Sequence, residues 1–247
     1  MWGFAPLLRQ LGNDLGFVPF VIGVSVGLYV LCLLMSGGDI GLRGGFLNIL
    51  APSTSALVRF GASGAIPVFA YGDWWTVLSA TWLHGSLLHI LFNMMWVRDL
   101  GPATANVIGP ARTVIIYVVS GASGFILSSF MGYYGPRLPL LGGAMLTVGA
   151  SASIFGLLGA LVHYGRVSGS SLIRGEAARY ALILFAFGLF MRGIDNYAHA
   201  GGFIGGYAVS MFFNPLTRER GDHMLIAVLC LVATFVAIGL SFVSNLT

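Results

Sequence analysis

MLIAVLCLVATFVAIGLSFV, residues 224–243, is a run of twenty residues without a single charged side chain. A second run of this kind, FVPFVIGVSVGLYVLCLLM, covers residues 17–35. A helix needs about 20 mostly apolar residues to cross the hydrocarbon core of a bilayer. Both runs therefore predict transmembrane helices, and this prediction decides the class of fold.

The composition of the whole chain agrees with a membrane protein. Of its 247 residues, 57% are hydrophobic and only 8% are charged, whereas soluble domains carry about 25% charged residues. This balance excludes an ordinary soluble enzyme, a disordered chain and a nucleic-acid-binding protein. The twelve basic residues are all arginines, and they are scattered through the chain rather than clustered. The expected surrounding partner is therefore the lipid bilayer, in a plasma or inner membrane.

Five further apolar runs complete the predicted topology. Several of them are short or are interrupted by polar residues, but each approaches the length that a membrane helix requires. The sequence thus predicts an all-α polytopic membrane protein with seven transmembrane helices, the other five at residues 83–97, 112–131, 150–163, 178–191 and 197–213.

The arginines predict the orientation of these helices, because cytoplasmic segments of membrane proteins are enriched in Lys and Arg. The N-terminal tail with the second, fourth and sixth loops holds eight arginines, and the other loops with the C-terminus hold four. The N-terminus is therefore expected in the cytoplasm and the C-terminus outside. The eight are Arg9, Arg98, Arg112, Arg166, Arg174, Arg179, Arg218 and Arg220, and the four are Arg43, Arg59, Arg137 and Arg192.

Three predicted spans contain polar clusters, and a polar side chain in hydrocarbon is costly enough to suggest function. The second holds His84, His89 and Asn93; the fourth starts near Ser151; the sixth starts near His199. All three spans start from the outer side in the predicted topology. The clusters are therefore expected to form one site in the outer half of the membrane.

Ser151 and His199 are the candidate catalytic pair, since a serine hydroxyl becomes a nucleophile when a neighbouring base takes its proton. Small residues recur every four positions in the fourth and sixth spans, which allows two helix backbones to approach closely. These stripes are Ala152, Gly156 and Ala160 in one span and Ala198, Gly202 and Gly206 in the other.

Donors for an oxyanion are also present near the predicted pair. Ser151 is expected at a helix N-terminus, where N–H groups are free. Asn93 and His89 could add side-chain donors, and their spacing of four places them on one helix face. The nearest carboxylate, Asp195, lies one turn before His199, outside the predicted spans. A Ser-His dyad is therefore favoured over a triad.

These residues resemble those of a known family, the rhomboid intramembrane serine proteases of the six-plus-one transmembrane subtype. The resemblance rests on three motifs: His84-x4-His89-x3-Asn93; Gly149-Ala-Ser151-Ala with Phe155-Gly; and Ala-His199-x2-Gly202-x3-Gly206. Two positions depart from the family pattern. Ala152 follows the serine where glycine is common, and Thr76 follows Trp75 where the family has an arginine.

The resemblance implies a role for each residue. Ser151 would be the nucleophile, His199 the general base and acid, and Asn93, His89 and the Ser151 N–H group the oxyanion hole. His84 would support that region by hydrogen bonding, and Phe155 would carry the histidine ring. Gly202 and Gly206 would let the sixth helix pack closely. The substrate would be a transmembrane protein, cut in or near its membrane segment toward the extracytoplasmic side, without metal or cofactor.

The resemblance also implies how the chain is organised. Residues 1–16 would form a short cytoplasmic segment, and residues 17–213 a six-helix catalytic core. The long first loop of that core, residues 36–81, is apolar and contains Trp74 and Trp75, so it is expected to be embedded at the membrane interface. Residues 214–247 would form a linker and the seventh transmembrane helix.

Other interpretations of these residues have less support. A rhomboid-like pseudoprotease that binds membrane clients without cutting them is the main alternative, although such proteins typically lack the serine or the histidine. A metal site of His84, His89 and His199 lacks an intramembrane carboxylate and a His-Glu-x-x-His motif. Gly-Ala-Ser also occurs at two other places, each time followed by glycine, at residues 61–64 and 121–124, where helix packing explains it.

Overall fold

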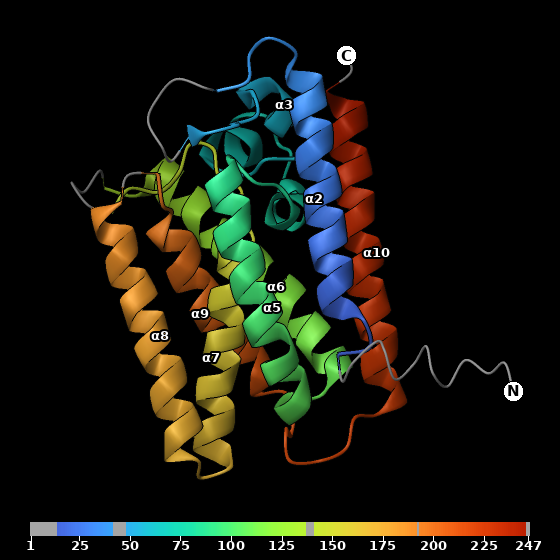
Figure 1. Ribbon diagram of the computed structural model, residues 1–247, viewed down its shortest axis with the longest axis vertical. Coiled ribbons are helices and arrows are strands. Elements are labelled where there is room, and N and C mark those ends of the chain that lie inside the picture. The colour runs from blue at the N-terminus through green and yellow to red at the C-terminus, as the bar shows by residue number, and fades with distance from the viewer. Residues whose placement is uncertain (1–13, 42–47, 137–140, 192, 246–247) are drawn as a thin grey trace, which may run out of the picture.

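The computed structural model describes residues 14–41, 48–136, 141–191 and 193–245. Within these residues the fold consists of helices, with two isolated β-bridges in the loops. The long helices alternate in direction along the chain and pack side by side (Figure 1). They are α2 (Phe17–Ser36), α5 (Leu87–Ile108), α6 (Pro110–Tyr134), α7 (Ser151–Val167), α8 (Ser171–Phe190), α9 (Asn196–Ser210) and α10 (Gly221–Ser244).

Three of these helices are long and apolar enough to cross a membrane by themselves: α2, α6 and α10. The helices α7 and α9 have only 17 and 15 residues, and α5 and α8 carry charged and polar side chains along their length. The all-helical fold is confirmed for the described residues, whereas the count of seven membrane spans stays a prediction.

Two of the predicted helix starts are wrong. The span predicted at residues 83–97 is α5, which begins only at Leu87 because the Ser86 hydroxyl accepts a hydrogen bond from the His89 N–H and caps the helix. His84 therefore precedes the helix. The span predicted at residues 178–191 is α8, which begins earlier, at the Ser170 cap. The ends of the other long helices differ from the predicted ones by at most four residues.

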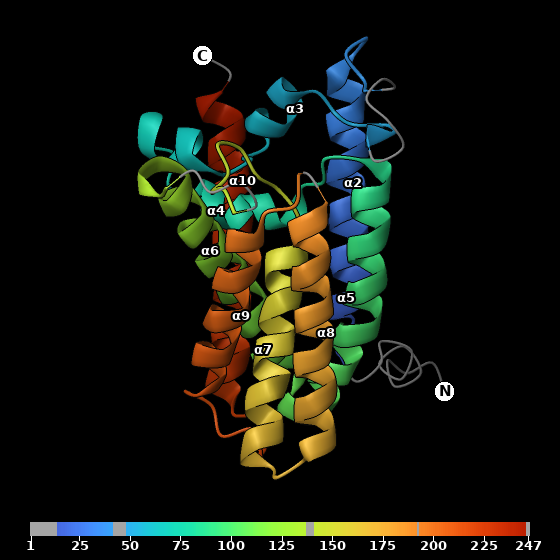
Figure 2. The same ribbon diagram turned by 90° about the vertical axis from the view of Figure 1, so that its left-hand side faces the viewer.

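The first loop is ordered into short helical pieces, as its apolar content suggests. These pieces gather at the end of the molecule where α7 and α9 begin (Figure 2). Its residues 42–47 lie outside the described part of the chain, and its embedding in the membrane interface stays a prediction. The pieces are α3 (Thr54–Arg59), a π-helical turn (Ile66–Ala70), α4 (Thr76–Ser79) and a 3₁₀ turn (Ala80–Trp82).

Thr76, the position at which the resemblance leads to the expectation of an arginine, makes its own local contacts. It is 2% exposed. Its hydroxyl donates to the carbonyl oxygen of Asp73 at 2.7 Å and lies 3.3 Å from the Ser63 hydroxyl. The neighbouring Trp75 donates its indole N–H to the Ser241 hydroxyl at 3.1 Å, which fastens the loop to α10. The loop is thus held together with threonine at this position.

Helices α6, α7 and α9 form the tightly packed centre of the fold, and glycines make this possible. A methyl group at Gly202 would overlap the backbone of Ala152, and one at Gly206 would overlap the backbone of Gly156. On α6, a methyl group at Gly124 would collide with the backbone of Ala198. The small-residue stripes therefore bring α7 and α9 into backbone contact, as their spacing predicts.

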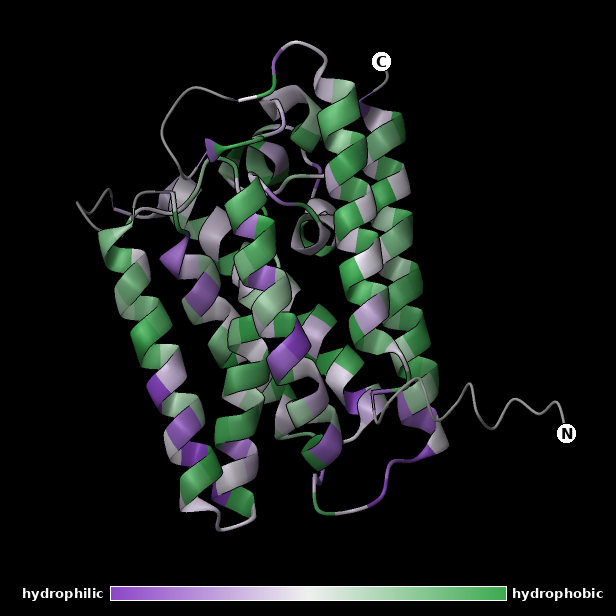
Figure 3. Ribbon diagram, in the orientation of Figure 1, coloured by the Kyte–Doolittle hydropathy of each residue, from purple (hydrophilic) through white to green (hydrophobic). Residues whose placement is uncertain are grey.

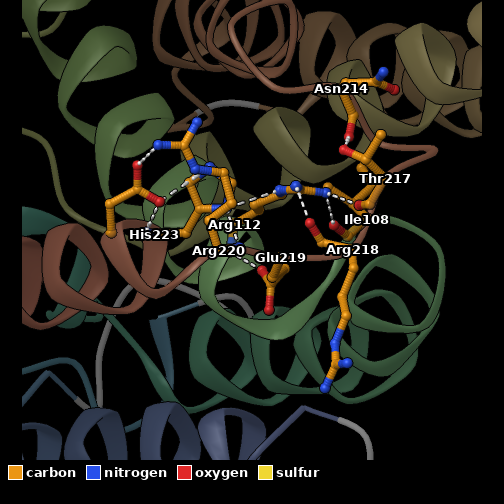
Figure 4. A network of polar contacts seen from close by, with 9 residues as sticks. Ile108, Arg112, Asn214, Thr217, Arg218, Glu219, Arg220 and His223 are labelled. Carbon is orange, nitrogen blue, oxygen red and sulfur yellow. Dashed lines mark hydrogen bonds and ion pairs between the residues drawn. The ribbon is translucent and has the colours of Figure 1, made fainter.

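A buried arginine fixes α10 to the core at the opposite end of the molecule. Arg112, near the start of α6, is 2% exposed. Its guanidinium donates to the carbonyl oxygens of Thr217 and Arg218 and to Nδ1 of His223 (Figure 4). Its backbone N–H donates to the Glu219 carboxylate at 2.7 Å. The segment between α9 and α10 is thereby held against the α5–α6 turn.

The described arginines lie mostly in the half of the molecule that contains the α5–α6 turn, where Figure 3 shows most of the hydrophilic colour on the helices. Arg98 lies near the middle of α5, and Arg59 lies in α3 at the other end. Four arginines counted for the topology, Arg9, Arg43, Arg137 and Arg192, lie outside the described residues, as do residues 1–13 of the predicted cytoplasmic segment. The remaining six are Arg112, Arg166, Arg174, Arg179, Arg218 and Arg220.

Candidate active site

The structure brings Ser151 and His199 into direct contact. Ser151 is the first residue of α7, and His199 lies in the first turns of α9. The Ser151 Oγ and the His199 Nε2 are 3.0 Å apart, which is hydrogen-bond distance. Ser151 is partly exposed, whereas His199 is 5% exposed. Ser151 is thus partly accessible at the start of α7, and its partner ring is held inside the bundle.

Phe155 supports the histidine ring from the same helix as the serine. It lies four residues after Ser151, so both side chains lie on one face of α7. The Phe155 and His199 rings are stacked, with centroids 4.2 Å apart and planes inclined by 14°. Phe155 is itself 3% exposed and packed in the core. Its ring is therefore a rigid support that limits the tilt of the imidazole.

His89 lies next to the segment that leads into Ser151, and Asn93 lies one turn further along α5. Gly149 has a φ of +131°, and a methyl group on it would lie 2.7 Å from the Nε2 of the His89 ring. Only glycine therefore fits at this close approach. Asn93 is 5% exposed, and its side-chain amide donates to the His89 carbonyl oxygen at 2.8 Å. Both residues are on the α5 face toward this segment.

His84 is fully buried, but ahead of α5 rather than within it. Its ring packs edge-on against the His89 ring, with centroids 5.3 Å apart. The contact between the two rings is packing, and the hydrogen-bonding role predicted for His84 stays a prediction. His84 is positioned to hold the His89 ring in place.

The start of α7 offers free backbone donors. Ala150 is the N-cap residue and provides no side-chain acceptor, so no side chain caps the first N–H groups of the helix. These groups and the positive end of the helix dipole lie directly at the Ser151 hydroxyl. The arrangement fits the stabilisation of a negatively charged oxygen that develops beside the serine.

Asp195, the carboxylate nearest to His199 in the sequence, binds the start of α9 and not the histidine ring. Asp195 caps α9, with Oδ1 accepting from the Ala198 N–H at 3.0 Å and Oδ2 accepting from the Ser128 hydroxyl. The Nδ1 atom of His199 has no hydrogen-bond partner among the described residues. The geometry is therefore that of a Ser-His pair. Ser128 was missed at the sequence level, because it lies 67 residues from Asp195 and belongs to no motif.

The serines of the two other Gly-Ala-Ser copies, and Ser153 beside the candidate nucleophile, have structural contacts. The Ser123 hydroxyl donates to the Val119 carbonyl oxygen in its own helix at 2.8 Å. Ser63 is fully buried and pairs with the backbone of Thr147. Ser153, two residues after Ser151, donates to the Tyr117 carbonyl oxygen at 2.6 Å.

Comparison with known proteins agrees with these motifs. Residues 71–216 match the rhomboid domain family, and this segment covers more than half of the chain. The chain belongs to the rhomboid family. Rhomboid protease GluP of Bacillus subtilis is 31% identical over 187 residues, which are 74% of this chain and 34% of that protein. RHOMBOID-like protein 2 of Arabidopsis thaliana is 33% identical over 167 residues, 65% of this chain and 49% of that protein.

Family membership confirms the resemblance found in the motifs. This rhomboid chain is an integral membrane protein, and its family includes proteins named as proteases. The chain spans only about a third to a half of the length of these two relatives. The contact between Ser151 and His199 falls inside the matched domain.

Proposed function

We propose that this rhomboid chain is an intramembrane serine protease that hydrolyses peptide bonds in or near the transmembrane segments of membrane proteins. The observation that carries the proposal is the 3.0 Å distance between the Ser151 Oγ and the His199 Nε2. A serine at this distance from a buried imidazole can transfer its proton as it attacks a carbonyl carbon. Membership in a family that includes named proteases supports this assignment.

Ser151 and His199 would divide the chemistry between them. His199 Nε2 takes the hydroxyl proton while Ser151 Oγ bonds to the scissile carbonyl carbon. The tetrahedral intermediate then collapses, and the same proton passes from His199 to the leaving amine. Water then attacks the acyl-serine while His199 takes its proton, and that proton passes to the Ser151 Oγ as the ester bond breaks and the second product is released. The Phe155 ring keeps the imidazole in the plane that both transfers require.

The oxyanion of the intermediate would be stabilised from two sides. One side is the start of α7, where no side chain caps the first N–H groups. The other is α5, which carries His89 next to Gly149 and Asn93 one turn further on. The Asn93 amide has a second N–H group besides the one directed at the His89 carbonyl oxygen. No metal or cofactor enters the reaction.

The site is proposed to face away from the cytoplasm. Among the described arginines, six lie in the half opposite to Ser151, and only Arg59 lies at the same end. Exposed aromatic residues surround the Ser151 end, as expected at a membrane–water interface. They include Tyr71, Trp74, Tyr133 and Tyr134. The N-terminus would then be cytoplasmic and the C-terminus outside, and a transmembrane substrate would reach the serine from the membrane.

A cleavage assay in liposomes with a generic single-span substrate tests the proposal. Wild type is expected to produce two fragments, and Ser151→Ala is expected to produce none. Ser123→Ala is the matched control, because Ser123 lies in the same Gly-Ala-Ser context but donates to its own helix. Full cleavage by Ser151→Ala would refute the mechanism. Wild type that captures the substrate without cutting it would favour a pseudoprotease.

A further inference from the structure

Asp195 and Ser128 form a polar chain that joins three parts of the site. The Ala144 N–H donates to the Ser128 hydroxyl at 3.3 Å. The Ser128 hydroxyl in turn donates to Oδ2 of Asp195 at 2.5 Å. The other carboxylate oxygen accepts from the Ala198 N–H. A single carboxylate thus connects the loop before α7, helix α6 and the start of α9.

The loop before α7 is also held on its other side. Thr147 and Ser63 exchange two backbone hydrogen bonds, of 3.0 and 2.7 Å. The Gly149 N–H donates to the Ala80 carbonyl oxygen at 2.9 Å. The first loop therefore fixes this segment along its length, since Ala65 also donates its N–H to the Ala144 carbonyl oxygen at 2.9 Å. The Ser128–Asp195 chain adds a bond to the Ala144 N–H. Two residues after Gly149 comes Ser151 itself.

We propose that Asp195 is a positioning residue: through Ser128 it keeps the start of α9 aligned with the loop that leads into α7, so that His199 stays within reach of Ser151. This inference rests on the proposed protease function. Asp195 acts on His199 through the backbone of α9, and its carboxylate makes no described hydrogen bond to the imidazole. Its own carbonyl oxygen accepts from the His199 N–H at 3.1 Å, so a shift of Asp195 moves the histidine directly.

A simple helix cap would not require the second oxygen. An N-cap side chain needs one acceptor for the N–H groups of the first turn, and Oδ1 provides it. The bond from Ser128 is additional, and it is charge-assisted when the carboxylate is ionised. Ser128 is fully buried, so water does not compete for this bond. Through this bond Asp195 is connected to α6 and to Ala144, which a residue that only caps α9 would not be.

Asp195→Asn separates the two roles. Asparagine caps a helix about as well as aspartate, so the bond from Ala198 is kept. Its amide nitrogen can donate a hydrogen bond but cannot accept one, so the charge-assisted bond that the carboxylate accepts from Ser128 is lost. Wild type, Asp195→Asn and Ser128→Ala are compared in detergent for kcat, KM and melting temperature. The matched controls are Asp39→Asn, at an exposed carboxylate, and Ser129→Ala, whose buried hydroxyl has no partner among the described residues.

Both link variants are expected to lower kcat about tenfold with KM unchanged, because small displacements of catalytic groups are costly. The double variant should lose no more than either single variant, since both remove the same link. The controls should keep the wild-type kcat. Unchanged kcat in Asp195→Asn, or losses that simply add in the double variant, would overturn the positioning role.

Hydrogen exchange at the Ala144 amide separates this inference from the proposed function. Exchange should accelerate in Asp195→Asn, because the Ser128 hydroxyl that accepts from Ala144 loses its charge-assisted bond to the carboxylate. Asp39→Asn should leave it unchanged. If wild type proves inactive, the protease proposal fails, and exchange still tests the link. Unchanged Ala144 exchange in Asp195→Asn would then overturn the link itself.

Discussion

The imidazole of His199 lies on the phenyl ring of Phe155, with ring centroids 4.2 Å apart and planes inclined by only 14°. Phe155→Leu removes this flat support but keeps an apolar side chain of similar size. We expect kcat to fall about tenfold, because the ring can tilt away from the Ser151 hydroxyl. The measurement is kcat per folded protein in the liposome assay.

Phe125→Leu is the matched control for that change. Phe125 is also a buried phenylalanine, at 1% exposure, but it packs against Val77 and Ala80. Both variants should lose some stability, whereas only Phe155→Leu should lose kcat. Equal losses of kcat in the two variants would show that Phe155 contributes only to packing and does not support the histidine ring.

The Asn93 side chain makes one described hydrogen bond, to the His89 carbonyl oxygen in its own helix. Losing that bond should cost little stability. In the proposed mechanism, however, Asn93→Ala removes a donor to the oxyanion, so kcat should fall about 10²-fold with KM unchanged. Asn214→Ala, at an exposed position at the other end of the molecule, should retain wild-type kcat. An unchanged kcat in Asn93→Ala would show that Asn93 has only a structural role.

Gly202→Ala tests the close packing of α7 on α9. The added methyl group would overlap backbone atoms of Ala152, which cannot move away as a flexible side chain could. We expect a loss of about 1–3 kcal/mol in stability, seen as a lower melting temperature in detergent. At Gly239 in α10 an added methyl group meets nothing within 4 Å, so Gly239→Ala should not lower the melting temperature. Equal melting temperatures for the two variants would contradict this packing.

Burial raises the pKa of Asp195 above its ordinary value of 3.8, although hydrogen bonds from Ser128 and neighbouring N–H groups oppose the shift. Between the ordinary and the raised pKa, the folded chain binds more protons here than the unfolded chain does. The contribution of Asp195 to the free energy of unfolding should therefore fall as pH rises through this window. Melting curves from about pH 4 to about pH 8 should show this decline in wild type, and Asp195→Asn should weaken it. The same dependence of melting temperature on pH in both proteins would contradict a raised pKa at Asp195.

Much of the fold could be predicted, because hydropathy alone marks an apolar helix. The run at residues 224–243 corresponds to α10 almost in full, and the run at 17–35 to α2. The starts of α5 and α8 were misplaced because the residues that fix them, Ser86 and Ser170, act by capping. A cap is a single hydrogen bond to the backbone, so it leaves no mark on the hydropathy of a whole segment.

The proximity of Ser151 and His199 could be anticipated for a similar reason. Small residues at a spacing of four predict which helix faces meet, and the polar residues lie beside them. The link from Ser128 to Asp195 could not be anticipated, because it joins side chains 67 residues apart. The spacing of apolar or small residues does not predict such a contact, because it forms only when α6 packs against α9.

The central claim is that Ser151 is the nucleophile and that His199 activates it. A fluorophosphonate probe reacts covalently with an activated serine, and peptide mass spectrometry then identifies the modified residue. The account predicts a single adduct on Ser151 in wild type, and none in His199→Ala. An adduct on Ser123 or Ser153 instead, or full labelling of Ser151 in His199→Ala, would contradict it.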